Sequence, residues 1–120
     1  MSLWDEVRQA FTAHVREDWG DTDALSALNR IAAKVLGLTH VLSINPSNTA
    51  VRLELLSEQQ LESLKPFRPK SPAPAMNREP IVLLEYGEQI VIVDGNKRVS
   101  KWQKEETKRS RKALILTPTQ

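Results

Sequence analysis

The sequence predicts an α+β (α/β) domain in which a mixed sheet is flanked by helices. Apolar residues recur at helical spacing through residues 3–36, and short runs of aliphatic residues occupy the last third of the chain. With 120 residues, 40% of them apolar, the chain is large enough for one compact core. We therefore expect residues 1–38 to form a helical extension packed on a single domain over residues 39–120.

The N-terminal extension is expected to be a helical hairpin. Ser2 is placed to cap a first amphipathic helix, which would end near Asp18–Gly20. A second helix would begin at Asp21 or Thr22 and end at Gly37, since glycine suits the left-handed position after a helix. The outer surface of these helices is a candidate docking surface for a protein partner.

Two short strands and a short helix are predicted next. Val41–Ile44 and Val51–Leu55 are the strand candidates, and they are separated by turn-forming residues. Ser57 and Gln60 have the spacing of a capping box, which predicts a helix over Glu58–Lys65.

A proline-rich segment follows, because five of the seven prolines fall within residues 66–80. Proline lacks a backbone N–H and fixes φ, so an extended, semi-rigid loop is expected there. The loop is either a surface connection or a lid over a site.

A β-hairpin and a third buried strand are predicted in the last third of the chain. Ile81–Leu84 and Gln89–Val93 flank a glycine turn and are apolar on both faces, which favours central positions in a sheet covered on each side. Ala113–Leu116 supplies another buried strand. The connection over residues 95–112 is long enough for a helix.

Asp94 to Arg98 is the most informative stretch, since it leads from a buried strand into a predicted helix. Gly95 lets the backbone approach an anion, and the N–H groups of Asn96, Lys97 and Arg98 would lie at a helix start. Arg98 offers a bidentate fork and Lys97 a flexible point charge. A phosphate-binding turn is the prediction, and a purely structural strand-to-helix turn is the alternative.

Two carboxylates near this turn are candidate catalytic residues. Asp94 would either cap the following helix or bind a metal-bridged phosphate, and Glu79 is a second candidate. A nucleotide bound there would bring Mg²⁺ as its cofactor. No metal site formed by the protein alone is predicted, since the chain has no cysteine and His14 and His40 lack a second ligand at metal spacing.

Basic charge is concentrated after the glycine turn. Residues 97–112 carry a net charge of +6, although the whole chain carries only +2. The cationic residues are Lys97, Arg98, Lys101, Lys104, Lys108, Arg109, Arg111 and Lys112. Such a segment either attracts a polyanion or forms a solvated helix face. Lys101, Lys104, Lys108 and Arg109 are the candidate nucleic-acid contacts.

The order strand, tight turn, strand, Asp-Gly-x-x-Arg, helix, strand over residues 80–116 resembles the ParB/sulfiredoxin superfamily. The matching motifs are the Pro80–Ile81 strand start and the Gly95–Arg98 turn, and the likeness extends over residues 40–117. It implies the mixed sheet of that fold. It also implies that the turn holds nucleotide phosphates. In relatives the nucleotide is ATP, in sulfiredoxin and the free serine kinases, or CTP, in the partition proteins.

This resemblance implies a nucleotide- or nucleic-acid-phosphate-binding ParB-like domain. If the protein is an enzyme, it would be a phosphate-ester hydrolase of nucleotidase, ATPase or nuclease type. Asn96 occupies the place of the cysteine that sulfiredoxin needs, which excludes a sulfinic acid reductase. The alternative is a non-enzymatic DNA-associated or protein-interaction regulatory module of a plasmid, phage or bacterial chromosome.

The sequence gives no indication of a membrane partner. No apolar run approaches the roughly 20 residues that cross a bilayer, and the first residues do not have the pattern of a signal peptide. We therefore expect a cytoplasmic protein.

Overall fold

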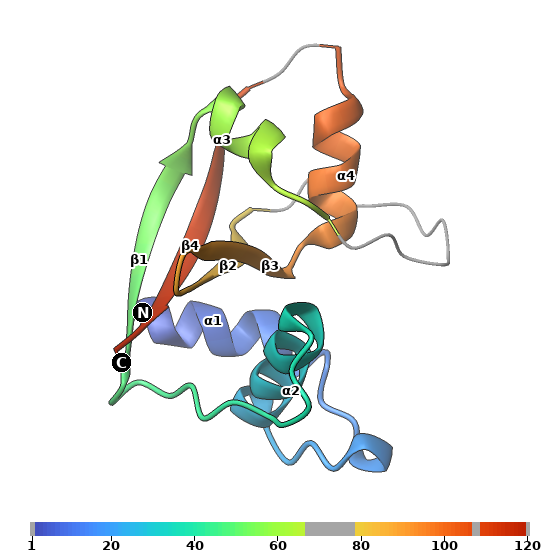
Figure 1. Ribbon diagram of the computed structural model, residues 1–120, viewed down its shortest axis with the longest axis vertical. Helices are drawn as coiled ribbons and strands as arrows, with labels where there is room; N and C mark the ends of the chain where they lie inside the picture. The colour runs from blue at the N-terminus through green and yellow to red at the C-terminus, as the bar shows by residue number, and fades with distance from the viewer. Residues whose placement is uncertain (1, 67–78, 107–108, 120) are drawn as a thin grey trace.

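The computed structural model describes residues 2–66, 79–106 and 109–119. A four-stranded mixed sheet has helices on both faces (Figure 1), which confirms the predicted α+β class. The helices are α1 (Leu3–Thr12), α2 (Ala24–Leu36), α3 (Glu58–Ser63) and α4 (Asn96–Lys104), with a 3-10 turn η1 (Glu17–Trp19). The strands are β1 (Thr49–Leu56), β2 (Ile81–Tyr86), β3 (Gln89–Asp94) and β4 (Arg111–Pro118).

The strand order is β1-β4-β2-β3. β1 pairs with β4 and β2 with β3 in antiparallel fashion, whereas β2 and β4 are parallel and are joined through β3 and α4. The predicted hairpin is confirmed, but only β2 takes a central position. β3 lies at an edge, and its Ile90 is 51% exposed. An apolar run alone does not distinguish an edge strand from a central one.

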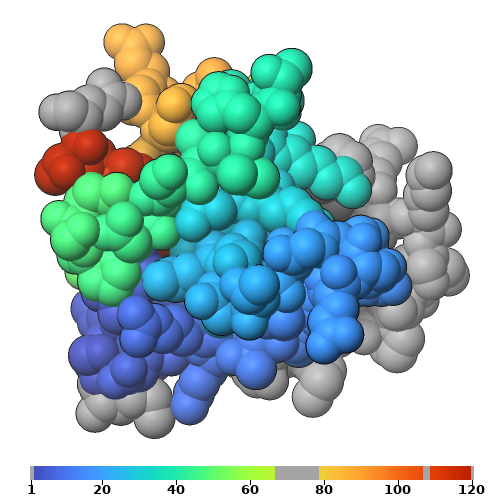
Figure 2. Space-filling model, turned by 90° about the horizontal axis from the view of Figure 1, so that it is seen from below, coloured from blue at the N-terminus to red at the C-terminus, as the bar shows by residue number. Residues whose placement is uncertain are grey.

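The sheet separates two apolar clusters, since successive side chains of a strand point to opposite faces. Leu114 and Leu116 of β4 join the cluster that contains Phe11 of α1 and Leu28 of α2. Ile115 of β4 joins the opposite cluster, which is covered by α3 and α4. Figure 2 shows the N-terminal helices spread over one face of the molecule.

The predicted helical hairpin is present, with different boundaries. Ser2 caps α1 through a capping box, as predicted, but α1 ends at Thr12 rather than near Asp18–Gly20. The residues beyond it form a turn and then η1. Gly37 ends α2 with a left-handed φ of 74°, which confirms its predicted role.

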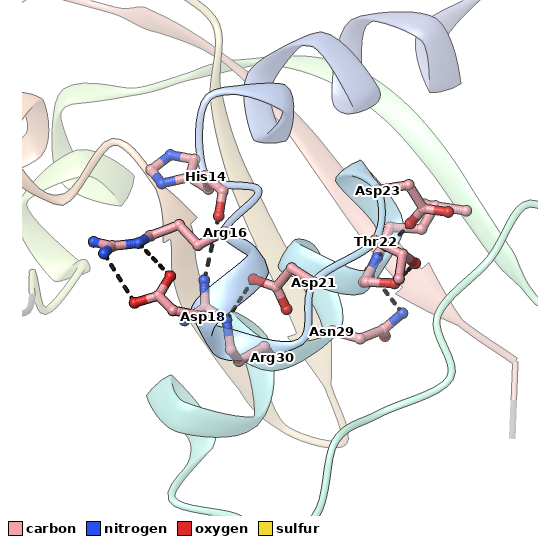
Figure 3. A network of polar contacts seen from close by, with 10 residues as sticks. His14, Arg16, Asp18, Asp21, Thr22, Asp23, Asn29 and Arg30 are labelled. Atoms are coloured by element: carbon pink, nitrogen blue, oxygen red, sulfur yellow. Dashed lines mark hydrogen bonds and ion pairs between the residues drawn. The ribbon is translucent and has the colours of Figure 1, made fainter.

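The second helix begins later than predicted, because Asp23 is its N-cap. The Asp23 carboxylate accepts a hydrogen bond from the Ser26 N–H at 2.9 Å. Asp21 is instead buried, and its carboxylate pairs with the Arg30 guanidinium at 2.7 Å (Figure 3). This long-range ion pair occupies the side chain that the sequence offered as a cap.

The predicted strand over Val41–Ile44 is wrong, because these residues have no strand partner. They form an irregular segment that is held by the side chain of Asn29 on α2. The Asn29 amide donates to the Ile44 carbonyl at 3.0 Å and accepts from the Ile44 N–H at 2.7 Å. A side-chain amide thus makes the two hydrogen bonds that a neighbouring strand would make.

The elements that follow agree more closely with prediction. β1 extends the predicted Val51–Leu55 strand at both ends, and the Ser57–Gln60 capping box begins α3. α3 ends at Ser63, two residues earlier than expected. Most of the predicted proline-rich loop, residues 67–78, lies outside the described residues. None of the helices in the described part of the chain is long and apolar enough to span a membrane.

Candidate functional site

The predicted strand-to-helix turn is present at Gly95. β3 ends at Asp94, Gly95 is the N-cap of α4 with a φ of 110°, and the Val99 N–H donates to the Gly95 carbonyl at 2.9 Å. A Cβ at Gly95 would lie 2.5 Å from Cγ2 of Ile81 on the neighbouring strand. Close packing therefore requires glycine here, in addition to the positive φ.

Asp94 does not cap α4, which corrects one of its two predicted roles. The N-cap residue of this helix is Gly95, which has no side chain to make a cap hydrogen bond. The Asp94 carboxylate instead accepts from Nη2 of Arg98 at 2.9 Å, and the two side chains are only 12% and 11% exposed. Nη1 of Arg98 also contacts the Pro80 carbonyl, at 3.5 Å. Arg98 is thus oriented toward protein oxygens.

His14 is the residue of this site that sequence reasoning missed. It follows α1, and its Nε2 lies 3.5 Å from the second carboxylate oxygen of Asp94. Its ring also lies 5.7 Å from that of Phe11. No local pattern could have indicated this contact, because the two partners are 80 residues apart and meet only when α1 packs on the sheet.

The two predicted carboxylates line one cavity of about 220 Å³ beside the turn. Glu79 is exposed and accepts a hydrogen bond from the Lys112 N–H at 2.6 Å. Glu6 of α1 adds a third carboxylate to the same cavity. This lining disfavours a bare phosphate but suits one that is bound with a cation. Among the described residues, no group of three His, Cys, Asp or Glu side chains is arranged to hold a metal ion.

Three exposed lysines follow one face of α4. Lys97, Lys101 and Lys104 are spaced four and three residues apart, so their side chains lie on the same side of the helix. We call these three residues the lysine ridge. The opposite side of α4 is buried through Val99 and Trp102.

The remaining predicted cations are not all at the surface. Arg111 is 2% exposed, its guanidinium lies 4.4 Å from the Trp102 ring centroid, and its Nη2 contacts Glu105 at 3.3 Å. Arg111 is therefore part of the core, contrary to its inclusion in a basic surface cluster. Arg109 is exposed, and Lys108 lies outside the described residues.

A second polar cluster lies on the sheet face that carries α3 and α4. Arg52 of β1 pairs with Glu54 at 2.7 Å and with Glu85 of β2, and Glu85 also accepts from Thr117 at 3.1 Å. The hydrogen bond from Arg52 holds the pKa of Glu85 below its usual range, and the Thr117 hydroxyl acts in the same direction. The hydrogen bonds to Glu85 and to Glu54 raise the pKa of Arg52.

Comparison of the chain with protein-family models, with curated proteins and with solved structures returned no match. The resemblance to the ParB/sulfiredoxin superfamily therefore stays a prediction. What the geometry offers is a glycine-started helix, a lysine ridge that begins at its first turn, and a carboxylate-lined cavity beside it.

Proposed function

We propose that this protein is a ParB/sulfiredoxin-like module that binds the phosphates of a nucleic acid along α4. The observation that carries the proposal is the lysine ridge, which presents three cations on one exposed helix face. The positive end of the helix dipole lies at Gly95, next to Lys97, and adds to the attraction for an anion.

The length of the lysine ridge favours a nucleic acid over a single phosphate group. Lys97 and Lys104 are seven residues apart, which corresponds to about 10 Å along a helix axis. Phosphates of one DNA strand follow one another at roughly 3.4 Å along the duplex axis, so the ridge spans several of them. Arg98 contributes less, because Asp94 already pairs with its guanidinium.

A nucleotide bound with Mg²⁺ is the second candidate, and the carboxylate-lined cavity favours it. Glu79 and Asp94 line this cavity beside the Gly95 turn, where a cation bridging to phosphate oxygens would offset their charge. In a phosphate-ester hydrolase these two carboxylates would position that cation. This function uses the cavity, whereas the first uses the lysine ridge.

Fluorescence anisotropy with labelled single- and double-stranded DNA and RNA at several salt concentrations tests the first function. Each lysine that contacts a phosphate of duplex DNA should contribute about 0.9 to the slope of log K against log salt. The variant Lys97→Gln/Lys101→Gln/Lys104→Gln should therefore weaken binding at every sequence and flatten the slope.

The matched control removes three exposed cations elsewhere. It is Arg8→Gln/Lys34→Gln/Lys65→Gln, with the same change in net charge. If both triple variants weaken binding equally, the effect is one of net charge and the assignment to α4 is wrong. If the unaltered protein binds no nucleic acid at low salt, the proposal fails.

Thermal unfolding with ATP, CTP or GTP and Mg²⁺ tests the second function, because a ligand that binds only the folded state raises the Tm. The expected result is a rise that requires Mg²⁺ and is reduced in Glu79→Gln. Glu88→Gln, on the exposed hairpin turn, is the control. A rise in Tm that is equally large without Mg²⁺ would contradict a role for the carboxylates.

A further inference from the structure

β1 forms one outer edge of the sheet (Figure 1). It pairs with β4 in an uninterrupted register, from Thr49 opposite Pro118 to Leu56 opposite Arg111. Among the described residues, no backbone group of β1 bonds to any segment other than β4. Half of its N–H and C=O groups therefore face outward, as expected of an edge strand.

This edge lacks several of the features that usually prevent strands from pairing between molecules. Residues 49–56 contain no proline, lysine or β-bulge, and their charged residues are Arg52 and Glu54, which have opposite signs. The opposite edge differs, because the pairing of β2 with β3 is shifted between Val82 and Leu83. β1 is thus the edge of the sheet with the more regular pairing.

Apolar side chains accompany this edge. Leu53 is 47% exposed and Leu55 is 64% exposed, and they alternate along the strand, so they share one face. Val51 lies on the same face and is half-buried. An added strand would cover the two exposed leucines.

The sequence of β1 is self-complementary when two copies are placed antiparallel with Leu53 opposite Leu53. In this register Val51 lies opposite Leu55 of the partner subunit on the apolar face. On the other face Arg52 lies opposite Glu54 of the partner subunit, and the reciprocal pair follows by symmetry. Opposite charges directly across an antiparallel pair are stabilising, and like charges are destabilising.

We propose that two copies of this chain associate through antiparallel pairing of β1, centred on Leu53, into a continuous eight-stranded sheet. Arg52 and Glu54 are 42% and 40% exposed, so both remain accessible to a second chain. Their contact within one chain then becomes part of a network of four alternating charges. The proposal is independent of phosphate binding, since α4 is not part of this edge.

Sedimentation velocity over a range of protein concentrations tests the association. The unaltered chain should show twice the monomer mass, and Arg52→Glu and Glu54→Arg should each be monomeric because they place like charges opposite each other. An equimolar mixture of these two variants should restore the dimer, since it places two carboxylates opposite two guanidinium groups. Ile90→Lys, on the other edge, should leave the dimer intact.

Three results would overturn the proposal: a monomeric unaltered chain at all concentrations, self-association of the single variants equal to that of the unaltered chain, or no recovery in the mixture. Circular dichroism of each variant distinguishes loss of association from loss of folding. This control is needed for Arg52→Glu, because Arg52 also contacts Glu85 and Thr117.

A disulfide test measures the register. The chain has no cysteine, so Leu53→Cys introduces a single thiol that would lie opposite its own copy. Oxidation should cross-link this variant. Leu55→Cys should not cross-link, because the two thiols would be four residues out of register, about 13 Å apart, beyond the roughly 7 Å Cα separation that a disulfide spans. Cross-linking of Leu55→Cys with none at Leu53→Cys would overturn the register.

Discussion

Asp94 and Arg98 form a nearly buried ion pair, with 2.9 Å between Oδ2 and Nη2, one helical turn apart around Gly95. The guanidinium that the Gly-x-x-Arg pattern offers to a ligand thus already has a carboxylate partner. A phosphate at this turn would compete with Asp94 for Arg98. We therefore assign the larger part of the proposed phosphate binding to the lysine ridge.

The first prediction concerns this ion pair. Asp94→Asn should lower the free energy of unfolding by about 2 kcal/mol, because it removes the carboxylate charge that pairs with a mostly buried guanidinium. Chemical denaturation measures the loss. Asp18→Asn is the control, since Asp18 pairs with Arg16 but is 59% exposed, and it should cost less than about 0.5 kcal/mol. If the two variants lose equal free energies of unfolding, the burial of the pair between Asp94 and Arg98 does not strengthen its contribution.

A second prediction follows from the packing of Gly95. Gly95→Ala should destabilise the protein by about 2 kcal/mol or more, because the new Cβ would collide with Ile81 and the backbone would keep a positive φ. Gly87→Ala is the matched control. Gly87 also has a positive φ, of 62°, but no atom lies within 4 Å of its Cβ position, so the cost should be smaller. Urea unfolding compares the two variants.

The third prediction tests the start of α2. Asp23→Ala should cost about 1 kcal/mol, since it removes the side-chain acceptor for the Ser26 N–H. Thr22→Ala should cost less, because the Thr22 hydroxyl is 3.3 Å from the Ser26 hydroxyl and does not accept from a backbone N–H of the described residues. The midpoint of denaturant unfolding reports both values. A larger loss for Thr22→Ala would move the helix start to the position expected from the sequence.

The fourth prediction is a pH dependence. The hydrogen bond from Arg52 lowers the pKa of Glu85 in the folded protein below its ordinary value of 4.5. The contact therefore stabilises the fold above pH 4.5, and this contribution is lost as the pH falls through the lower, folded-state pKa. Unfolding should be followed at several pH values. The free energy of unfolding should fall less steeply with decreasing pH in Glu85→Gln than in the unaltered chain.

Glu88→Gln is the matched control for this pH dependence. It removes an exposed carboxylate from the turn of the same hairpin. If both variants change the acid loss equally, the contact between Arg52 and Glu85 is not its cause.

Local patterns predicted the elements whose boundaries depend on nearby residues. Ser2 and Ser57 cap helices through partners three residues away. Gly95 connects β3 to α4 with a positive φ, which glycine adopts readily. Long-range contacts account for the misses. The Val41–Ile44 segment is held by Asn29, which no short window of sequence could indicate.

The candidate site likewise has features that local sequence predicts and features that depend on long-range packing. The helical spacing of the lysine ridge and the geometry of the Gly95 turn follow from the sequence. The contact of Asp94 with His14 depends on how α1 packs, and the burial of Arg111 depends on Trp102. Charge counted along the chain therefore overestimated the charge at the surface.

The division of the apolar residues into two clusters on opposite faces of the sheet has a consequence for evolution. An apolar substitution in α1 or α2 requires compensation in the cluster that contains Phe11 and Leu28. An apolar substitution in α4 requires compensation in the opposite cluster. Apart from the contact of His14 with Asp94, selection on the apolar side of α4 can thus proceed separately from selection on the apolar side of the N-terminal hairpin. β2, β3 and β4 each contribute to both clusters, and they are the parts of the chain that should tolerate the least divergence.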